Sequence, residues 1–529
     1  MKLIINELRL PLDGSRRELK RMAAGKLGIS PSELIRFKIV KEAIDARRKP
    51  DVSRVYSVLA EIPDNHSYRK GSGVREAAEE PETPVVPGTA RMDGRPVVVG
   101  SGPAGIFAAL TLAEAGYRPL VLERGESVEK RAETVEKYWK TGVLDPESNV
   151  QFGEGGAGTF SDGKLTTRIN DRRCEKVLQQ YYKAGAHEEI LYRSKPHIGS
   201  DVLMTVVSNM RKRLVELGGE IRFGAKVTSV SIIGRRAAAV RVNGSEEIKA
   251  GVVVLAPGHS ARDTFEELLR SGVRMVQKPF SIGVRIEHPQ EMINIAQYGS
   301  AHISGIIGPA DYQLHCRTGE RTAYSFCMCP GGIVVAAASE QDTIVTNGMS
   351  YFTRDRENSN SAFVVNVEQG DFGSSDPLAG IAFQRKWESE AFKAAGRSGA
   401  APVQLLGDFI KGRVSKRFGA VKPSYTGKVD FADINSCLPD FVTAVMKESA
   451  AYFDRKLKGF AMDDALLTGI ETRTSSPVRM TRGDTLEAEG ISGLYPCGEG
   501  AGYAGGIISA AVDGMRVAER IILTYSLPS

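Results

Sequence analysis

Residues 96–123, PVVVGSGPAGIFAALTLAEAGYRPLVLE, constrain the fold more than any other part of the chain. An apolar strand leads into a Gly-x-Gly-x-x-Gly turn, and a helix, a second apolar strand and the acidic residue Glu123 follow. This order predicts a strand–helix–strand unit of a parallel sheet with a dinucleotide bound at the turn. The alternative is the same unit without a ligand, and the completeness of the pattern argues against it.

Each glycine of the turn has its own purpose. Gly100 lets the chain turn out of the strand, Gly102 lets the backbone approach a pyrophosphate, and Gly105 lets the helix pack closely on the sheet. The free N–H groups and the dipole of the helix N-terminus favour the negative charge of the pyrophosphate. We therefore predict cofactor contacts from the turn, from a carboxylate that accepts from ribose hydroxyls, and from its neighbour: Gly100, Ser101, Gly102, Pro103, Ala104, Gly105, Glu123 and Arg124.

Two further segments match the glycine pattern incompletely. Residues 153–158 follow no apolar strand, and residues 500–505 lie between a strand and a helix but lack a second strand and acidic residue. One complete fingerprint predicts one tightly held dinucleotide. It argues against separate complete sites for a flavin and a nicotinamide.

Three later segments favour FAD over NAD. Residues 251–265 form a strand that ends in Ala256-Pro257-Gly258, which resembles the Ala-Thr-Gly turn of two-dinucleotide-binding flavoproteins. Residues 493–521 resemble a C-terminal flavin motif, in which an acidic residue binds the ribityl chain and a helix N-terminus faces the flavin. We expect contacts there from Gly498, Glu499, Gly505, Gly506 and Ile507.

The third segment is a pair of short stretches, residues 220–223 and 226–230. They resemble the strand that closes on the adenine end of the cofactor, and Val227 is the contact we expect there. Any one of the three segments is compatible with an ordinary α/β core. Their common order and separation from the fingerprint make FAD the preferred cofactor.

These motifs resemble a family of FAD-dependent dehydrogenases, found mainly in bacteria, whose substrate is unassigned. The resemblance covers nearly the whole chain. It implies an oxidoreductase of the α/β class, with an FAD/NAD(P)-binding Rossmann-like domain, an inserted α+β substrate domain and a small N-terminal α+β domain. It supplies neither a substrate nor a catalytic residue. Its most specific pieces are VVVGSGPAGIFAAL, NVQFGEGGAGTFSDGKLTTR, VLAPGHSARDTF, NGMSYFTRDRENSNSAFVV, GIETRTSSPVR and YPCGEGAGYAGG.

A length of 529 residues predicts two or three domains. We expect a small domain over 1–74, a Pro/Glu-rich linker over 75–90, an FAD-binding domain over 91–274 plus 471–529, and an inserted substrate domain over 275–470. Periodicity predicts helices over 16–26, 378–395 and 438–457, a short helical turn over 32–34, and strands over 3–12, 35–46, 53–62, 280–288, 312–318, 322–329 and 332–338.

Composition excludes several classes of protein. Hydrophobic residues make up 42% of the chain, without an apolar run as long as a membrane span or a signal-peptide core, so we expect a cytoplasmic protein. The first 80 residues hold 17 Lys and Arg against 12 Asp and Glu, most of the net charge of +6. This mild bias argues against a nucleic-acid binder.

The six cysteines are scattered, which fits reduced thiols better than a disulfide framework. Only Cys327 and Cys329 are close together, and we predict that both are buried strand thiols. The alternative is a redox-active pair, which the short separation strains. No metal site is expected, because no further ligands occur at short spacing.

Several residues are weaker candidates for the site. The Gly-rich loop 151–168 predicts flavin contacts from Gly155, Gly156 and Lys164, the alternative being a flexible surface loop. A single histidine such as His197 is more often structural than catalytic. Arg285 and Arg473 could bind an anionic substrate, although each fits an ordinary ion pair better. The polar run 358–362 could cap a helix or line a pocket.

The predicted function is hydride transfer through FAD to or from a small-molecule substrate held against the flavin by the inserted domain. NADH or NADPH could act as a transient electron donor. Two alternatives stay open: a flavoprotein that binds or modifies RNA through its N-terminal domain, and a structural FAD in an electron-transfer assembly. The sequence predicts no catalytic acid or base and no oligomeric state.

Overall fold

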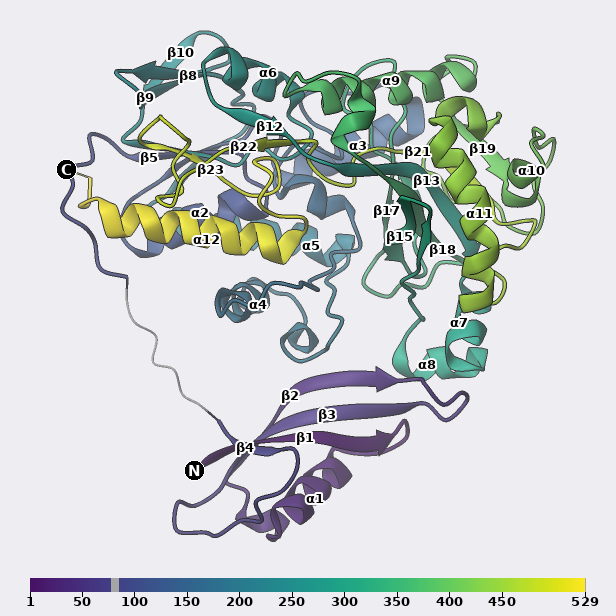
Figure 1. Ribbon diagram of the computed structural model, residues 1–529. Coiled ribbons are helices and arrows are strands. Elements are labelled where there is room, and N and C mark those ends of the chain that lie inside the picture. The colour runs from purple at the N-terminus through teal and green to yellow at the C-terminus, as the bar shows by residue number, and fades with distance from the viewer. Residues whose placement is uncertain (78–84, 529) are drawn as a thin grey trace.

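The N-terminal part of the chain forms an antiparallel sheet with one helix on its face (Figure 1). The computed structural model describes residues 1–77 and 85–528. The helix is α1 (Arg16–Leu27), preceded by Ser15, which forms a capping box with Glu18 and so satisfies free N–H groups of the first turn. The strand order is β2 (Arg36–Asp45), β3 (Ser53–Glu61), β1 (Lys2–Pro11) and β4 (Val74–Glu76), with the short η1 (Pro31–Glu33) before β2. The elements predicted here are confirmed.

The segment between this sheet and the rest of the chain differs in part from the predicted linker. Strand β4 pairs with β1 and so extends two residues into 75–90. Residues 78–84 of the predicted linker lie outside the described residues. Beyond them, Gly88 N donates to the carbonyl oxygen of Ile522 at 2.8 Å, so this end of the segment is attached to the C-terminal helix.

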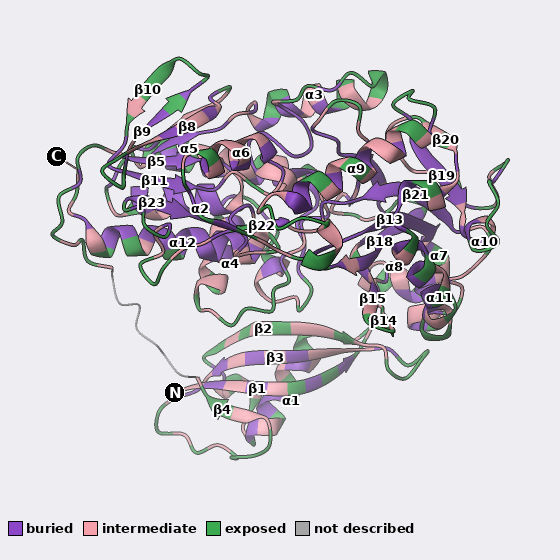
Figure 2. Cartoon of the chain, turned by 45° about the horizontal axis from the view of Figure 1, so that its top comes forward, coloured by how far each residue is buried: buried purple, intermediate pink, exposed green. Residues whose placement is uncertain are grey.

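A parallel sheet forms the centre of the molecule. Its order is β23 (Leu494–Pro496), β11 (Val252–Leu255), β5 (Pro96–Val99), β6 (Leu120–Leu122) and β7 (Glu220–Arg222). Strands β23, β11, β5 and β6 are buried throughout, as unbroken apolar runs in a sheet covered on both faces should be (Figure 2). Helices α2 (Pro103–Glu114) and α12 (Ile507–Thr524) lie side by side against one face.

The second face of the parallel sheet is covered by a small antiparallel sheet and a helix. The sheet order is β10 (Glu246–Lys249), β9 (Arg236–Val242) and β8 (Val227–Ile233), and the helix is α6 (Arg262–Arg270). We expected residues 220–223 and 226–230 to act together as one closing strand. Instead β7 belongs to the parallel sheet and β8 to the antiparallel one, because the chain turns between them at Gly224, whose φ is +60°.

The second large sheet is mainly antiparallel. Its order is β14 (His315–Thr318), β15 (Arg321–Cys329), β18 (Asn358–Val367), β13 (Phe280–Pro289), β21 (Leu466–Glu471), β19 (Ala401–Leu405) and β20 (Val429–Phe431), with only β19 and β20 parallel. Helix α11 (Asp440–Lys456) packs against β13, β14, β15 and β18, and α9 (Ala379–Ala394) packs near β19 and β21. These helices and the strands predicted over 280–288 and 322–329 are confirmed.

The polar run 358–362 lies inside β18 and caps no helix, contrary to one expectation. All five residues are buried, and none of them lines the main cavity. The polar atoms bond to neighbouring strands instead. For example, Asn360 accepts from the guanidinium of Arg285 at 3.0 Å.

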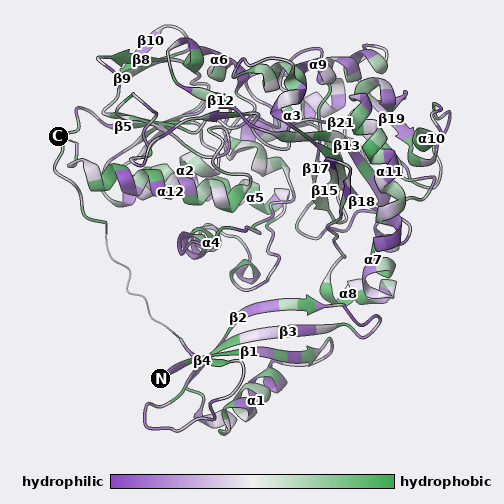
Figure 3. Ribbon diagram, viewed as in Figure 1, coloured by the Kyte–Doolittle hydropathy of each residue, from purple (hydrophilic) through white to green (hydrophobic). Residues whose placement is uncertain are grey.

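A short two-stranded ribbon lies where the chain crosses between the parallel sheet and the large antiparallel sheet. Strand β12 (Met275–Gln277) pairs there with β22 (Val478–Met480), so the chain leaves the parallel-sheet part and returns to it at the same place. Helix α12 carries alternating hydrophobic and hydrophilic residues along its length (Figure 3). No helix among the described residues is long and apolar enough to span a bilayer.

The remaining elements are β16 (Ile333–Ala336), β17 (Thr346–Met349), α3 (Val128–Thr141), η2 (Gly156–Phe160), α4 (Arg173–Lys183), η3 (Glu188–Leu191), α5 (Ser200–Glu216), α7 (Gln290–Tyr298), η4 (Ala301–Ile303), α8 (Ser304–Ile307), η5 (Gln369–Phe372), α10 (Leu406–Ile410) and η6 (Ile434–Cys437).

Candidate functional site

A cavity of about 1450 Å³ lies between the parallel sheet and the large antiparallel sheet. On one side it is lined by Val99 and Leu122, at the carboxyl ends of β5 and β6, and by Ala256, just after β11. On the other side it is lined by Phe326 and Cys327 of β15. Open α/β sheets bind ligands at this edge, beyond the carboxyl ends of their strands.

The glycine turn after β5 forms one wall of this cavity. Gly100 has φ +96°, and a Cβ there would lie 2.3 Å from the carbonyl oxygen of Ala256. A Cβ on Gly105 would lie 2.0 Å from the carbonyl oxygen of Gly100, so both positions require glycine to keep the backbone in place. Gly102 is different, because its Cβ would meet only Gly156 Cα, at 3.8 Å. Its missing side chain leaves space open at the N-terminus of α2, which no side chain caps.

Glu123 organises this turn from the end of β6. One of its carboxylate oxygens accepts from the backbone N–H and hydroxyl of Ser101, both at 2.8 Å. The other accepts from the N–H groups of Gly125 at 3.0 Å and Gly153 at 3.1 Å. These four bonds connect two loops that both line the cavity. Next to it, Arg124 pairs with Asp263 and lies over the Phe152 ring.

The loop 151–168 is held by a residue that sequence analysis missed. Arg131 on α3 is fully buried, and its guanidinium donates to the backbone carbonyl oxygens of Asn149, Val150, Gly153, Glu154 and Gly156. Burial lowers its pKa to about 10, which leaves it charged at neutral pH. The loop is therefore a fixed wall of the cavity. No local motif surrounds Arg131, so the sequence carries no signal for this role.

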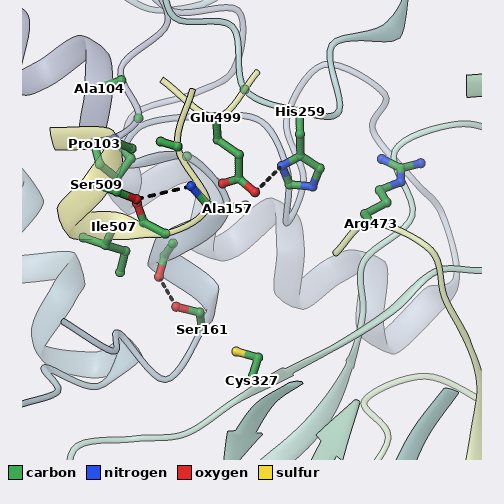
Figure 4. Close-up of a pocket in the computed structure, with 18 of the residues that line it drawn as sticks. Pro103, Ala104, Ala157, Ser161, His259, Cys327, Arg473, Glu499, Ile507 and Ser509 are labelled. Atoms are coloured by element: carbon green, nitrogen blue, oxygen red, sulfur yellow. Dashed lines mark hydrogen bonds and ion pairs between the residues drawn. The ribbon is translucent and has the colours of Figure 1, made fainter. Parts of the chain in front are cut away.

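Glu499 also lines this cavity, and its side chain lies beside that of His259 (Figure 4). The Nδ1 atom of His259 is 3.9 Å from the Glu499 carboxylate, and its Nε2 atom is buried without a hydrogen-bond partner. Burial raises the pKa of Glu499 to about 7, against the opposing charge of Lys278. Burial, with Arg473 and Arg262 nearby, lowers the pKa of His259 to about 3. The pair therefore consists of a neutral imidazole and a carboxyl group that titrates near neutrality.

A second set of polar side chains lines the same cavity: Cys327 comes from β15, and Lys164 comes from the loop 151–168. Cys327 is half-buried and lines the cavity, as does Lys164. Lys164 Nζ is 3.6 Å from Asp162, whose carboxylate also binds Arg354 at 2.6 Å. We expected both Cys327 and Cys329 to be buried, and only Cys329 is. A β-bulge between Phe326 and Cys329 accounts for the difference, because it turns Cys327 out of the regular strand.

Family models match most of the chain. Residues 279–474 match the C-terminal domain of FAD-dependent proteins, residues 94–277 match pyridine nucleotide-disulphide oxidoreductases, and residues 1–61 match a domain of unknown function. An uncharacterized protein of Clostridium beijerinckii is 52% identical over 541 residues, covering 100% of both chains. The chain belongs to an uncharacterised family of FAD-dependent oxidoreductases.

Solved structures resemble this flavoprotein more distantly. Glycine oxidase from Bacillus cereus has a TM-score of 0.31 and 11% identity, covering 81% of this chain and 94% of its own. L-proline dehydrogenase from P. horikoshii has a TM-score of 0.35 and 12% identity, covering 82% and 93%. CtdE in complex with FAD has a TM-score of 0.32 and 13% identity, covering 81% and 83%. Similarity at this level carries no conclusion about activity.

The residues of the cavity fit FAD, the cofactor of this oxidoreductase family. The uncapped N-terminus of α2 presents N–H groups and a positive dipole end, and Gly102 leaves the space that a pyrophosphate needs. The cavity exceeds the ~300–1,000 Å³ of an ordinary small-molecule pocket. The unpartnered His259 Nε2 is a polar atom available to a ligand.

Most of the predicted contact residues come together in this one cavity. Three do not line it: Gly105, Gly155 and Gly498, which lie next to lining residues in the chain. Gly155 has φ +82° and so shapes the loop, while Gly498 N donates to Asp513 at 2.8 Å. The predicted residues that line the cavity are Gly100, Ser101, Gly102, Pro103, Ala104, Glu123, Arg124, Gly156, Lys164, Val227, Ala256, Gly258, Glu499, Gly505, Gly506 and Ile507.

The weaker candidates are mostly structural. His197 does not line the cavity: it is buried, bonds to the carbonyl oxygen of Phe352 at 3.0 Å and stacks on that ring. Arg285 does not line it either and pairs with Glu471 at 3.3 Å. Arg473 does line the cavity, but Glu388 neutralises it at 3.3 Å. The expectation of an ordinary ion pair is thus confirmed for both arginines.

Proposed function

We propose that this flavoprotein is a dehydrogenase that transfers a hydride between FAD and a small molecule bound against the large antiparallel sheet. The observation that supports this is the extent of the cavity. The same space is lined by Gly102 at the α2 N-terminus and by Tyr324 and Phe326 on β15. A dinucleotide bound at the turn leaves the β15 end for a second molecule.

In this proposal the part of the chain with the parallel sheet binds FAD, and the part with the large antiparallel sheet binds the substrate. Residues 91–274 and 471–529 hold FAD, and residues 275–470 shape the substrate site. When bound, FAD supplies the two-electron centre for hydride transfer. The first turn of α2 binds the pyrophosphate, while Glu123 holds the glycine turn in place through the hydrogen bonds that it accepts from Ser101. Glu499 and the first turn of α12 bind the ribityl and ring end.

We propose that NADH or NADPH binds transiently and reduces the flavin, without a complete dinucleotide site of its own. The single complete fingerprint supports a transient visitor over a second tightly bound dinucleotide. All six cysteines are free thiols, which supports a reducing compartment such as the cytoplasm.

The decisive experiment is the visible spectrum of the purified protein, followed by anaerobic titration with NADH and then NADPH. We expect flavin absorbance that one of the two nucleotides bleaches. Flavin that neither nucleotide bleaches would count against a nicotinamide donor and favour a structural flavin. A colourless protein that FAD cannot reconstitute would refute the proposal as a whole.

A further inference from the structure

We propose that the substrate of this flavoprotein carries a carboxylate, which binds to Lys164 and Arg354 in the cavity. The inference rests on the proposed function in taking one end of the cavity as the substrate site, and it names the chemical class of the substrate. It is supported by an imbalance of charge at the cavity surface. Lys164 and Arg354 both line the cavity, whereas Asp162, the carboxylate that they share, does not.

The carboxylate of Asp162 is fully buried and binds its two cations unequally. Arg354 donates to it from Nε at 2.9 Å and from Nη2 at 2.6 Å, whereas Lys164 Nζ lies 3.6 Å away. Burial alone would raise the pKa of Asp162, but the charges of Lys164 and Arg354 lower it to about 2. The cluster therefore holds two positive charges and one negative charge at neutral pH.

The two cations have hydrogen-bond donors to spare. Within residues 1–77 and 85–528, neither Lys164 Nζ nor Arg354 Nη1 forms a hydrogen bond. A carboxylate can accept from both, because each of its two oxygens is an acceptor, and such charge-assisted bonds are short and strong. Its single negative charge also balances the surplus of the cluster, whereas a phosphate monoester would bring nearly two.

Both cations lie on the side of the large antiparallel sheet. Arg354 follows β17 in the chain, and β17 packs against β13 and β15. Lys164 forms a β-bridge with His197, whose ring bonds to the carbonyl oxygen of Phe352, two residues before Arg354. The cation pair is therefore attached to the part of the chain that we assign to the substrate.

The acidic residues that line the cavity do not neutralise this pair. Asp311 and Glu471 have cations of their own, at 2.7 and 3.3 Å. Glu123 is occupied by four donors at the glycine turn, and Glu499 titrates near neutrality beside His259. Arg168 also lines the cavity and has no acidic partner among the described residues, so it adds to the attraction of anions.

The test is binding of benzoate and pyruvate to the FAD-loaded protein, followed by isothermal titration calorimetry and by flavin absorbance. Benzamide is the neutral probe of matched shape, and inorganic phosphate is the probe with more charge. We expect both carboxylates to bind in the millimolar range and to shift the flavin absorbance. Benzoate should bind about 10-fold or more tightly than benzamide, because hydrogen bonds between charged groups are the stronger ones.

Four variants test whether the surplus charge is the cause. Lys164→Met and Arg354→Met each remove the surplus and should weaken benzoate binding by about 10-fold or more. Asp162→Asn keeps both cations and should bind benzoate at least as tightly as the wild type. Asp162→Asn combined with Arg354→Met restores a surplus of one charge and should bind benzoate more tightly than Arg354→Met alone. A purely structural cluster would lose binding in all four.

Lys195→Met is the matched control for the loss of a cation. Lys195 also lines the cavity, but its side chain is 68% exposed and pairs with Asp311. Solvent screens such a pair, so benzoate affinity should change by no more than about twofold.

Equal affinity for benzoate and benzamide, or no carboxylate binding in the millimolar range, would overturn the proposal. Tighter binding of phosphate than of either carboxylate would overturn the assigned substrate class. A Lys164→Met protein that loses as much affinity for FAD as for benzoate would place Lys164 at the flavin instead. A protein that binds no FAD would contradict the proposed function, and calorimetry with benzoate would still report on the cation pair separately.

Discussion

Arg131 on α3 donates from Nη1 to the carbonyl oxygen of Glu154, in the loop 151–168, at 2.6 Å. Four further backbone carbonyls accept from the same guanidinium. The loop carries Gly156 and Lys164, and both line the cavity. The buried guanidinium of Arg131 therefore fixes the backbone of this glycine-rich loop, which forms one wall of the cavity.

Replacing this residue should affect stability and cofactor content together. Arg131→Met leaves several buried carbonyls without a donor, and we expect a loss of ~2–5 kcal/mol in the free energy of unfolding and less bound FAD. Chemical denaturation and the flavin-to-protein absorbance ratio measure the two effects. Lys130→Met, at the exposed neighbour on α3, should change neither. An Arg131→Met protein with normal FAD content would contradict this role.

The contact between α2 and α12 can be tested with two helical glycines. A Cβ on Gly514 would lie 2.1 Å from the carbonyl oxygen of Ala104, whereas a Cβ on Gly25 in α1 would meet nothing within 4 Å. Gly514→Ala should therefore destabilise the protein by ~1–3 kcal/mol. Gly25→Ala should stabilise it by ~0.5–1 kcal/mol, because alanine has less freedom to lose on folding. Equal effects in thermal unfolding would count against close packing of the two helices.

The glycine turn allows binding to be separated from folding. Gly102→Ala places a Cβ in open space near Gly156, so the FAD-free protein should keep its stability. The same Cβ would occupy the place of the pyrophosphate and weaken FAD binding by about tenfold or more, that is ~1.4 kcal/mol. Gly105→Ala clashes with the backbone of Gly100 and should destabilise the fold itself. Fluorescence titration with FAD measures the first effect, and thermal unfolding measures the second.

Glu499 should make stability depend on pH in a defined direction. Burial raises its pKa from an ordinary 4.5 to about 7, so the folded state holds this proton more tightly than the unfolded state does. Its contribution is complete below pH 4.5 and is lost as the pH rises through 7. Glu499→Gln removes the titration and should gain stability relative to the wild type between pH 5 and 8. Denaturation curves that differ by a constant amount across this range would refute the shift.

Much of the dinucleotide-binding unit and of the N-terminal domain was predictable because the signals are local. The strand, glycine turn and helix over 96–114 follow from residue spacing, and the apolar periodicity over 16–26 predicts α1. Apolar runs such as 252–255 indicate buried parallel strands in the same way. Each signal depends on neighbours within a few positions, so no knowledge of the tertiary fold is needed.

Only the tertiary structure decided which polar side chains meet. It placed Lys164 and Cys327 on the same cavity although 163 positions separate them, buried His197 away from that cavity, and gave Glu123 four donors, one of them from Gly153 in the loop 151–168. Sheet order, bulges and loop paths determine such contacts, and these depend on the packing of the whole chain. The sequence by itself therefore determined the dinucleotide-binding unit and its cofactor, whereas long-range packing decided which side chains surround the substrate end.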